Sequence, residues 1–159
     1  MIRYAPARKR DAPAIARMSR DIIEAGLGWS WTTPRIERHI HDPETVVLTA
    51  SGADRLLGFA IMTFGDEDAH LKLLGVHPRY QRHGIGRALL SWLDETAKVA
   101  GIQTIYVEVR ASNRGGRTFY QRQGYRAIAY LPGYYRGRES AVRMLRDPVW
   151  HTDQPQRER

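Results

Sequence analysis

The chain has 159 residues, with 25 Lys and Arg against 17 Asp and Glu, so its formal net charge is +8. The absence of cysteine excludes disulfides, thiolate zinc sites and a cysteine nucleophile. The basic excess fits three kinds of partner: a nucleic acid, an acidic surface, or a small polyanion such as a nucleotide pyrophosphate.

The length is that of one domain, and we expect a single domain over residues 1–150 followed by a polar tail over 151–159. The longest apolar run, Leu56–Phe64, is well short of the ~18 residues of a membrane span. The N-terminal residues lack the charged-then-apolar layout of a signal peptide. We therefore expect a cytoplasmic protein with no membrane partner, either a monomer or a homodimer.

The first third of the chain predicts a strand, two helices and a β-hairpin. Apolar residues at helical spacing indicate the first helix between Asp11 and Gly26. Thr33 and Pro34 suit the N-cap and the first position of the second helix. The expected ranges are 2–5 for the strand, 11–26 and 33–42 for the helices, and 45–50 and 56–64 for the hairpin strands.

The next strand, over residues 69–76, has an apolar pattern that changes phase. Leu71 and Leu73 share one face of an alternating strand, whereas Leu74 and Val76 continue the alternation one residue later. An extra residue in the strand, a β-bulge near residues 73–75, would restore a single apolar face. A strand buried on both faces explains the pattern equally well.

The second half predicts an amphipathic helix, a strand, a short helix and a closing pair of strands. The long helix spans residues 84–100, the strand spans 104–109, and the short helix runs from an Asn113 N-cap to Gly124. Strands over 125–130 and 141–145 flank a Pro-Gly loop. The order β-α-α-β-β-β-α-β-α-β-β predicts an α/β fold with one mixed sheet and helices on its faces.

The segment Gln81-Arg-His-Gly-Ile-Gly-Arg87 lies between a predicted strand and the long helix. Two glycines two residues apart let the backbone approach a ligand, and the helix N-terminus adds partial positive charge. Arg82, His83 and Arg87 add basic side chains, so the segment is a candidate pyrophosphate cradle. A purely structural turn explains the glycines equally well. No Gly-Lys-Ser/Thr follows, which excludes a Walker A loop, and no third glycine supports a Rossmann fingerprint.

The segments Val76–Leu90, Glu108–Asn113 and Phe119–Tyr125, taken together, resemble the GNAT N-acetyltransferase family. The first is similar to that family's acetyl-CoA-binding motif, and the other two match its second conserved stretch. The likeness runs from about Ala69 to Leu145 and is greatest to ribosomal-protein-alanine and related protein N-terminal acetyltransferases, which also carry a pair like Tyr134-Tyr135. It implies a GNAT-like fold: a central, mostly antiparallel sheet with a splayed, bulged strand and helices on both faces.

The resemblance also implies acetyl-CoA as co-substrate and a set of residues that hold it. Leu74 and Val76 would pair their backbone with pantetheine, and their amides would polarise the thioester carbonyl. Asn113 would contact the cofactor in addition to capping its helix. The implied pyrophosphate contacts are Gln81, Arg82, His83, Gly84, Ile85, Gly86 and Arg87.

Glu108 is the candidate general base. It lies on the strand face opposite the apolar row of Ile105, Val107 and Val109. An α-amine has an ordinary pKa near 8, so a modest base acting through water would suffice. Position alone favours a solvated or salt-bridged Glu108, and it is the match to the Glu-Val-Arg-x-Ser-Asn motif that favours the catalytic role.

Tyr120 is the candidate general acid. A phenol with a pKa of about 10 is a plausible proton donor to a thiolate whose parent pKa is about 8.5. A core aromatic on a helix face is the more common fate of a tyrosine at helical spacing. The family resemblance, which places a tyrosine here facing the sulfur, favours the functional role.

Tyr134 and Tyr135 are candidates for the acceptor site, and Trp29, Trp31 and Glu139 are weaker ones. The two tryptophans equally suit a hydrophobic plug between the first two helices. His39 and His41 invite a metal hypothesis, but two histidines without a third ligand are typical of a surface, and we expect no metal.

These observations predict an enzyme that moves an acetyl group from acetyl-CoA to a primary amine by direct attack in a ternary complex. The expected acceptor is a protein or peptide N-terminus, and the first alternative is a small-molecule amine. An alternative of another class is a nucleic-acid-binding module with a stripe of arginines, but it explains neither the cradle nor Glu108. That stripe would consist of Arg110, Arg114, Arg117, Arg122 and Arg126. A family member that binds acyl-CoA without turnover is disfavoured by the presence of both Glu108 and Tyr120.

Overall fold

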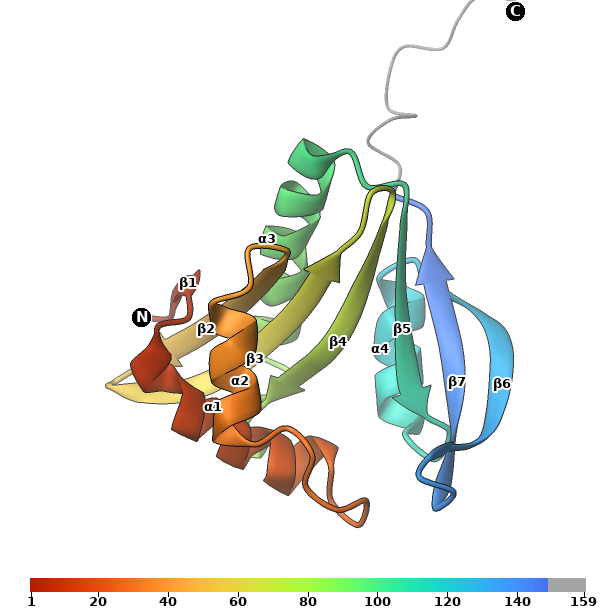
Figure 1. Ribbon diagram of the computed structural model, residues 1–159, viewed down its shortest axis with the longest axis horizontal. Coiled ribbons are helices and arrows are strands. Elements are labelled where there is room, and N and C mark those ends of the chain that lie inside the picture. The colour runs from red at the N-terminus through yellow and green to blue at the C-terminus, as the bar shows by residue number, and fades with distance from the viewer. Residues whose placement is uncertain (149–159) are drawn as a thin grey trace, which may run out of the picture.

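A single sheet organises the computed structural model, which describes residues 1–148 (Figure 1). Over these residues its seven strands lie in the order β1-β2-β3-β4-β5-β7-β6, and every neighbouring pair is antiparallel except β4 and β5. The strands are β1 Arg3–Pro6, β2 Thr45–Gly52, β3 Arg55–Phe64, β4 Asp68–Val76, β5 Thr104–Arg110, β6 Arg126–Tyr135 and β7 Glu139–Arg146. The predicted fold class and order of elements are confirmed.

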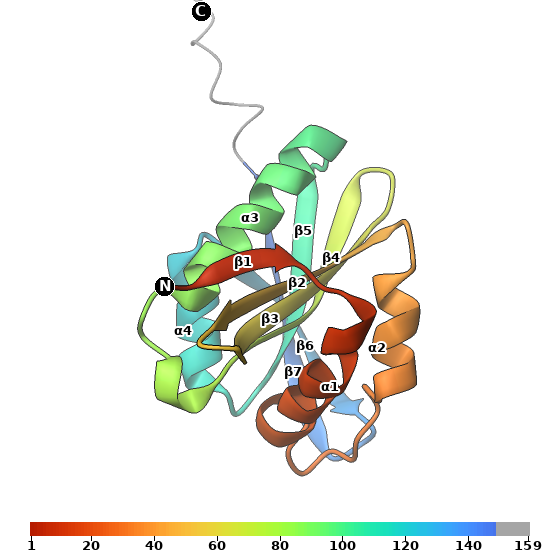
Figure 2. The same cartoon turned by 90° about the vertical axis from the view of Figure 1, so that its left-hand side faces the viewer.

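Helices cover the two faces of the sheet unequally (Figure 2). α1 (Ala12–Met18), which continues as a π-helical turn over Ser19–Ile23, and α2 (Thr33–Ile40) pack on β2–β4 around a core that includes Ile15, Ile36 and Phe59. α3 (Ile85–Ala100) and α4 (Arg114–Arg122) cover the opposite face. The face of β5 and β7 that α3 and α4 do not cover is therefore available to a site.

Capping explains where the two helices beside the cradle begin. Gly84 precedes α3 with φ +81° and Gly101 follows it with φ +76°, both in the left-handed region that favours glycine. Asn113 Oδ1 accepts a hydrogen bond from the Gly116 amide at 2.8 Å, so the predicted N-cap is confirmed.

Two predicted boundaries are wrong. The N-cap of α2 is Thr32, which places Thr33 and Pro34 inside the helix. β6 does not stop before the Pro-Gly pair but continues through Pro132 to Tyr135. Proline is tolerated there because β6 is an edge strand, and the register of β6 against β7 shifts between Leu131 and Tyr135.

The predicted β-bulge exists, one residue earlier than expected. Ile61 pairs with Leu73 and Met62 pairs with Leu71, so Lys72 is the extra residue of β4. Because of it, Leu71 belongs to the core under α3 and α4, whereas Leu73 belongs to the core under α1 and α2. The second interpretation, burial on both faces, therefore also holds in part.

The bulge coincides with the point where β4 leaves β5. The parallel ladder runs only from Asp68–Thr104 to Leu71–Val107. Beyond it β4 stays with β3, and β5 stays with β7 as far as Arg110, so the sheet opens like a V (Figure 1). A bulge increases local twist and ends pairing, which accounts for the separation at this residue.

None of the helices within residues 1–148 is long and apolar enough to cross a membrane. The predicted polar tail, residues 151–159, lies outside the described residues, as does the end of the predicted domain at residue 150.

Candidate active site

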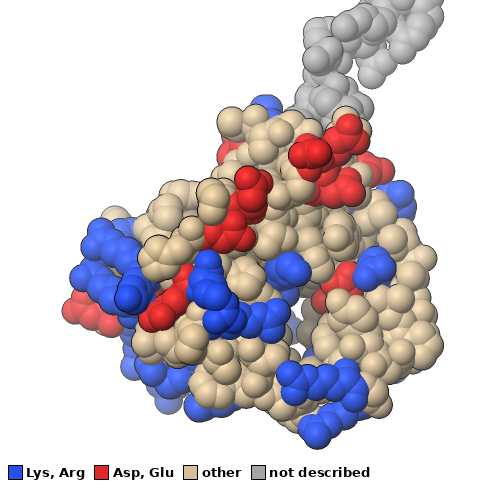
Figure 3. Space-filling model, viewed as in Figure 1, with Lys and Arg blue, Asp and Glu red and all other residues tan. Residues whose placement is uncertain are grey.

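A cavity of about 500 Å³ lies where β4 and β5 separate. The loop between α1 and α2 and the turn between β6 and β7 close one end of it. Figure 3 shows the hollow between the two halves of the molecule, with Lys and Arg atoms around it. Its walls include eight predicted site residues: Leu74, Val76, Gln81, Glu108, Asn113, Tyr120, Tyr134 and Tyr135.

The candidate pyrophosphate cradle lies at the start of α3. The first backbone hydrogen bond of α3 runs from the Ala88 amide to the Gly84 carbonyl. Within residues 1–148, the backbone amides of residues 82–87 therefore donate to no other group. These amides, together with the helix dipole, can receive an anion. Arg82, His83 and Gly84 are solvent-exposed, so a ligand can reach the cradle.

Local bonds hold the cradle in shape. Gln81 Nε2 donates to the Val76 carbonyl at 3.1 Å, and His83 Nδ1 lies 3.0 Å from the Gln81 carbonyl. Arg82 adopts φ +68°, and Gly84 follows in the left-handed region with open space where a Cβ would stand. Ile85 turns inward and is buried, which fixes the first turn of α3 to the core.

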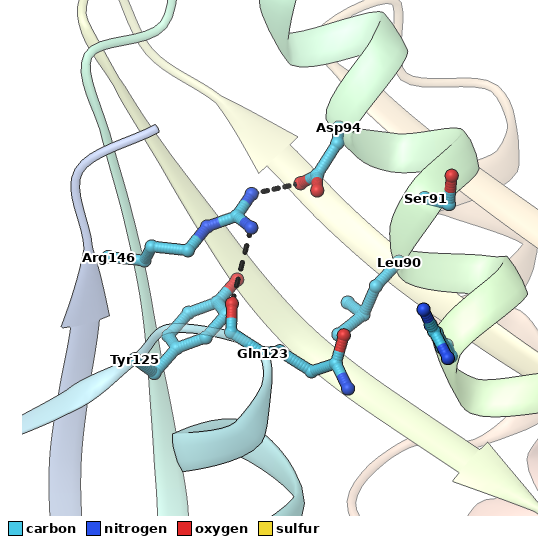
Figure 4. A pocket seen from close by; sticks show the side chains of 7 residues that line it. Leu90, Ser91, Asp94, Gln123, Tyr125 and Arg146 are labelled. Atoms are coloured by element: carbon cyan, nitrogen blue, oxygen red, sulfur yellow. Dashed lines mark hydrogen bonds and ion pairs between the residues drawn. The ribbon is translucent and has the colours of Figure 1, made fainter. Parts of the chain in front are cut away.

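Arg87 lines a second cavity of about 210 Å³, between α3 and the end of α4 (Figure 4). There Arg146 pairs with Asp94 and donates to the backbone carbonyl of Gln123 at 3.3 Å, so this side chain links α3, β7 and the end of α4. Burial raises the pKa of the neighbouring Tyr125 far above its ordinary range. The cavity is therefore a structural junction of α3, α4 and β7 beside the cradle.

The edge of β4 that faces the slot is unpaired beyond Leu71. Neither Leu74 nor Val76 has a partner on β5, while both remain paired with β3 through Ala60 and Gly58. An extended ligand can therefore lie along this edge and use the strand's free backbone groups. This is the geometry that the sequence implied for these two residues.

Glu108 is held between two side chains. Its Oε1 lies 2.6 Å from Nε2 of His70, and its Oε2 accepts from Nε of Arg143 at 2.7 Å. Only 6% of its side chain is exposed, so Glu108 is not solvated; its pair with Arg143 makes it the salt-bridged strand residue that position alone also favoured. Burial acts to raise the pKa of Glu108, but the hydrogen bonds from His70 and Arg143 outweigh it and hold that pKa below its usual value.

His70 is the residue that the sequence analysis missed. Its ring stacks on Tyr106 with 4.3 Å between centroids, and it lines the cavity. A carboxylate can only accept, so Nε2 of His70 carries the hydrogen of this bond, and Nδ1 is the ring nitrogen that Glu108 does not engage. On β4, His70 points to the face opposite that of Leu71, and β4 neighbours the strand that carries Glu108. This relationship is visible only once the parallel pairing of β4 and β5 is known.

Tyr120 lies in the wall of the cavity on α4. It packs edge-to-face on Phe119 and Tyr125, and 7% of the residue is exposed. Burial raises the pKa of Tyr120 well above its ordinary value, and the nearby Tyr125 and Tyr135 raise it further. The residue is therefore both a core aromatic and a protonated phenol facing the cavity.

Comparison with known proteins identifies the family to which this arrangement belongs. Residues 15–125 match the acetyltransferase (GNAT) family. The chain is a member of the GNAT family. The resemblance deduced from the three motifs is thus confirmed, and the slot between β4 and β5 lies inside the matched stretch.

One Escherichia coli sequence and two solved structures illustrate the relationship. The chain is 37% identical over 100 residues to the [ribosomal protein bS18]-alanine N-acetyltransferase of strain K12, covering 61% of this chain and 66% of that relative, just under two thirds. The crystal structure of the Escherichia coli ribosomal-protein-S18-alanine N-acetyltransferase has a TM-score of 0.79 at 27% identity, covering 92% of this chain and 94% of that one. PaiA N-acetyltransferase from Thermoplasma acidophilum, solved with coenzyme A, shares the fold with a TM-score of 0.80 at 20% identity, covering 93% and 99%.

In this GNAT protein the tyrosine pair lines the end of the cavity that the α1–α2 loop and the β6–β7 turn close. Tyr134 and Tyr135 stand edge-to-face, 5.0 Å between centroids, on β6. Burial and the Glu108 carboxylate raise the pKa of Tyr134, so its phenol lies close to the candidate base. Burial is also the main cause of the raised pKa of Tyr135, and the nearby Tyr134 and Glu108 raise it further.

The two tryptophans have different fates. Trp31 is buried and lines the cavity, and it also packs in the core under α1 and α2, so it serves as a plug and as a wall. Trp29 is 41% exposed, does not line the cavity, and lies under Arg20 at 5.5 Å. The structure therefore gives Trp29 no part in the site.

Glu139 is a clamp outside the cavity. It accepts from Arg110 Nε at 2.7 Å, from the Ser112 amide at 2.9 Å and from the Ser112 hydroxyl. Those bonds lower the pKa of Glu139 to about 2, with Ser112 as the main cause. Arg110 in turn donates to the carbonyls of Ile23 and Ala25, which ties β5 to the end of the first helix.

The arginines of the proposed nucleic-acid stripe do not form one surface. Arg110 is engaged with Glu139 and with the carbonyls of Ile23 and Ala25, and Nε of Arg117 is buried. Arg126 pairs with Asp147 at 3.7 Å, whereas Arg114 and Arg122 are exposed on α4. A continuous basic face of these five side chains is absent.

His39 and His41 each direct Nδ1 to a carbonyl of their own helix. The distances are 2.9 Å to Arg35 and 2.9 Å to Glu37. Among residues 1–148 no group of three His, Cys, Asp or Glu side chains is placed to hold a metal ion.

Proposed function

We propose that this GNAT protein transfers the acetyl group of acetyl-CoA to a primary amine by direct attack in a ternary complex. The observation that carries the proposal is the single cavity where β4 and β5 separate. The cradle borders one end of it, and Glu108, His70 and Tyr120 lie in its walls. Family membership supports acetyl-CoA as the donor.

The donor end supplies the contacts that an acyl-CoA needs. The free amides of residues 82–87 and the basic side chains beside them bind the pyrophosphate. Pantetheine pairs with the free edge of β4 at Leu74 and Val76, and an amide of that edge stabilises the tetrahedral oxyanion. Asn113, which lines the cavity from the N-cap of α4, contacts the same chain.

The base in this proposal is Glu108 acting with His70. Both carboxylate oxygens of Glu108 are engaged, so the atom open to a proton is Nδ1 of His70. Glu108 fixes the tautomer and stabilises the imidazolium that forms, as a carboxylate does in a Ser-His-Asp triad. The charged and titratable groups around the pair are Arg143 and Tyr134 beside Glu108, Tyr106 stacked on His70, and Lys72 on the same strand.

Each proton and bond of the reaction has a place. The acceptor ammonium loses a proton to the His70–Glu108 pair, directly or through water, and the neutral nitrogen attacks the thioester carbon. The carbon–sulfur bond then breaks, and the departing thiolate takes the hydroxyl proton of Tyr120. The nitrogen gives up its second proton, which restores the Tyr120 hydroxyl, and the proton held by the His70–Glu108 pair passes to solvent. The Tyr120 hydroxyl is protonated at neutral pH, and because burial raises its pKa and weakens it as an acid, it gives up the proton only to the thiolate that forms beside it.

The proposed acceptor is a protein or peptide N-terminus. The name of the Escherichia coli relative, an alanine N-acetyltransferase of ribosomal protein bS18, supports an α-amine acceptor. The cavity also opens beside the exposed Tyr134, where a chain can continue outward. A small-molecule amine is the alternative.

The test is release of free thiol from acetyl-CoA with Ala-initiated peptides and a panel of small amines. Three variants separate the roles: Glu108→Gln, His70→Gln and Tyr120→Phe. General acid–base groups contribute about 10²–10⁴-fold, so we expect kcat losses of about that size with the KM for acetyl-CoA little changed. His70→Gln keeps a donor for Glu108, so it tests the base and not the fold.

The pH profile distinguishes catalysis from support. Loss of the low-pH limb of kcat in His70→Gln would show that His70 itself titrates in the reaction. A full-rate His70→Gln enzyme would remove His70 from the mechanism and leave Glu108 as the base. Absence of turnover with every amine and peptide would refute the proposed activity.

A further inference from the structure

Three basic side chains line the acceptor end of the cavity without a carboxylate partner. They are Arg35 on α2, Lys72 at the bulge of β4 and Arg136 in the turn after β6. Among residues 1–148 none of the three has an Asp or Glu oxygen within 4 Å. Unpaired cations on a concave wall create a positive potential that favours an anionic ligand.

The carboxylates of the same wall are already saturated. Glu24 accepts from the Ser19 hydroxyl, from the amide and hydroxyl of Ser30, and from the Trp31 amide. Glu108 is occupied by its pairs on neighbouring strands. The cavity therefore offers no free carboxylate to a cationic side chain of an acceptor.

Two of the cations belong to elements that meet over the acceptor end. The guanidinium of Arg35 lies 3.7 Å from the centroid of Trp31, which fixes its position, and it also bonds the Ser30 carbonyl at 3.4 Å. Nη1 of Arg136 comes within 3.0 Å of the position that a Cβ on Gly28 would take. The β6–β7 turn thus brings Arg136 against the α1–α2 loop.

Burial lowers the pKa of Arg35, Glu24 opposes the effect, and Arg38 and Arg136 add to it. Arg35 and Arg136 line the same cavity, and repulsion from Arg136 is the smallest of the causes that lower the pKa of Arg35. A ligand carboxylate between them would relieve that repulsion and accept from planar donors suited to two parallel hydrogen bonds.

We propose that the acceptor is a primary amine that carries a carboxylate near its amine, held by Arg35, Lys72 and Arg136. This inference rests on the proposed acetyl transfer and names its substrate class. The shared chemistry is an acidic side chain shortly after a peptide N-terminus or the carboxylate of a free amino acid. The same cations also disfavour the ammonium form of the acceptor, which helps to supply the neutral amine that attacks.

The experiment compares kcat/KM for three matched peptides that begin Ala-Glu, Ala-Gln and Ala-Lys, together with free amino acids. We expect the Glu peptide to exceed the Gln peptide by about 5-fold and the Lys peptide by more, because Arg35 and Lys72 are half-buried and Arg136 is exposed, and charge pairs at such sites are worth about that much. Higher salt should weaken the preference. A free amino acid used as well as the Glu peptide would assign the site to small acceptors.

Charge variants locate the preference. Arg136→Gln and Lys72→Gln should each reduce the Glu-over-Gln ratio by several-fold, and Arg136→Glu should shift the preference toward the Lys peptide. Arg126→Gln, an exposed arginine at the far end of β6, is the matched control and should leave the ratio unchanged.

Two failures are distinguishable. Equal rates with the three peptides, or a preference for Lys, would overturn the anionic-acceptor inference and leave acetyl transfer standing. No thiol release with any acceptor would overturn the proposed function itself.

Discussion

The two ends of the cavity are built in different ways. The donor end uses consecutive residues, 81–87, and mainly their backbone amides, with one glycine whose φ is positive. The acceptor end uses side chains from the α1–α2 loop, α2, β4, β5 and the β6–β7 turn. A ligand shared by a whole family can be bound by a contiguous backbone motif, whereas a ligand that varies is bound by side chains that only the fold brings together.

Among the substitutions that compare ligand binding at the two ends, Gly84→Ala at the donor end should have the largest effect. An alanine at φ +81° costs about 1–2 kcal/mol, and the loop can escape this cost only by turning its free amides away from the phosphate. We expect the Kd for acetyl-CoA to rise about 10-fold. Isothermal titration with acetyl-CoA measures it.

Gly101→Ala is the control for that substitution. Gly101 also has a positive φ, +76°, also has open space where a Cβ would stand, and lies at the far end of α3. Both variants should lose similar stability, but only Gly84→Ala should lose cofactor affinity. Equal losses of affinity would mean that the cradle works through helix stability and not through its amides.

A smaller effect should come from Glu24→Gln at the acceptor end. The buried carboxylate organises the loop through Ser30 and Trp31, and a Gln amide would face donors with a donor. We expect a loss of about 1–3 kcal/mol in unfolding free energy. The KM for the acceptor should rise about 5-fold with the KM for acetyl-CoA unchanged, if each lost loop contact is worth about 1 kcal/mol.

Thermal unfolding and steady-state kinetics together test this second prediction. Asp21→Asn, which removes an exposed carboxylate paired with Arg20 on the same segment, should change neither quantity. A Glu24→Gln enzyme with a raised KM for acetyl-CoA would contradict the separation of the two ends.

The smallest effect is the loss, at acid pH, of the stability that the Glu139 hydrogen bonds contribute. The folded pKa of Glu139, about 2, is below the ordinary glutamate value near 4.3. Its contribution to stability is therefore complete above the unfolded pKa and is lost as pH falls from about 4.3 towards 2. Urea unfolding at several pH values should show that the difference in unfolding free energy between wild type and Glu139→Gln becomes smaller as the pH falls through that window.

Asp147→Asn is the reference for the clamp, because Asp147 is half exposed and lies 3.7 Å from Arg126. It should show little change in unfolding free energy at any pH. If the difference in unfolding free energy between wild type and Glu139→Gln stays constant down to pH 2, Glu139 stabilises the fold without its charge.

Local patterns in the sequence predicted most of the elements, including the helix that begins at the candidate cradle. The helical period of α3, its glycine ends and the Asn113 cap are short-range features, and each appears in the structure. The phase change in β4 predicted a bulge, but the position required the register against β3, which placed it at Lys72. The strand predicted over 125–130 ends too early, because a proline such as Pro132 is rare inside a strand. Only the sheet order shows that β6 lies at an edge, where proline is tolerated.

The sequence by itself determined the family, the cradle and the candidate roles of Glu108 and Tyr120, because these depend on residues near one another in the chain. Only the tertiary structure decided what surrounds Glu108, since His70 and Arg143 come from strands 38 and 35 residues away. It likewise gathered Arg35, Lys72 and Arg136, whose charges look scattered in the sequence. The physical reason is that the backbone chemistry of a phosphate site is local, whereas the charge balance of a pocket is a property of elements packed together.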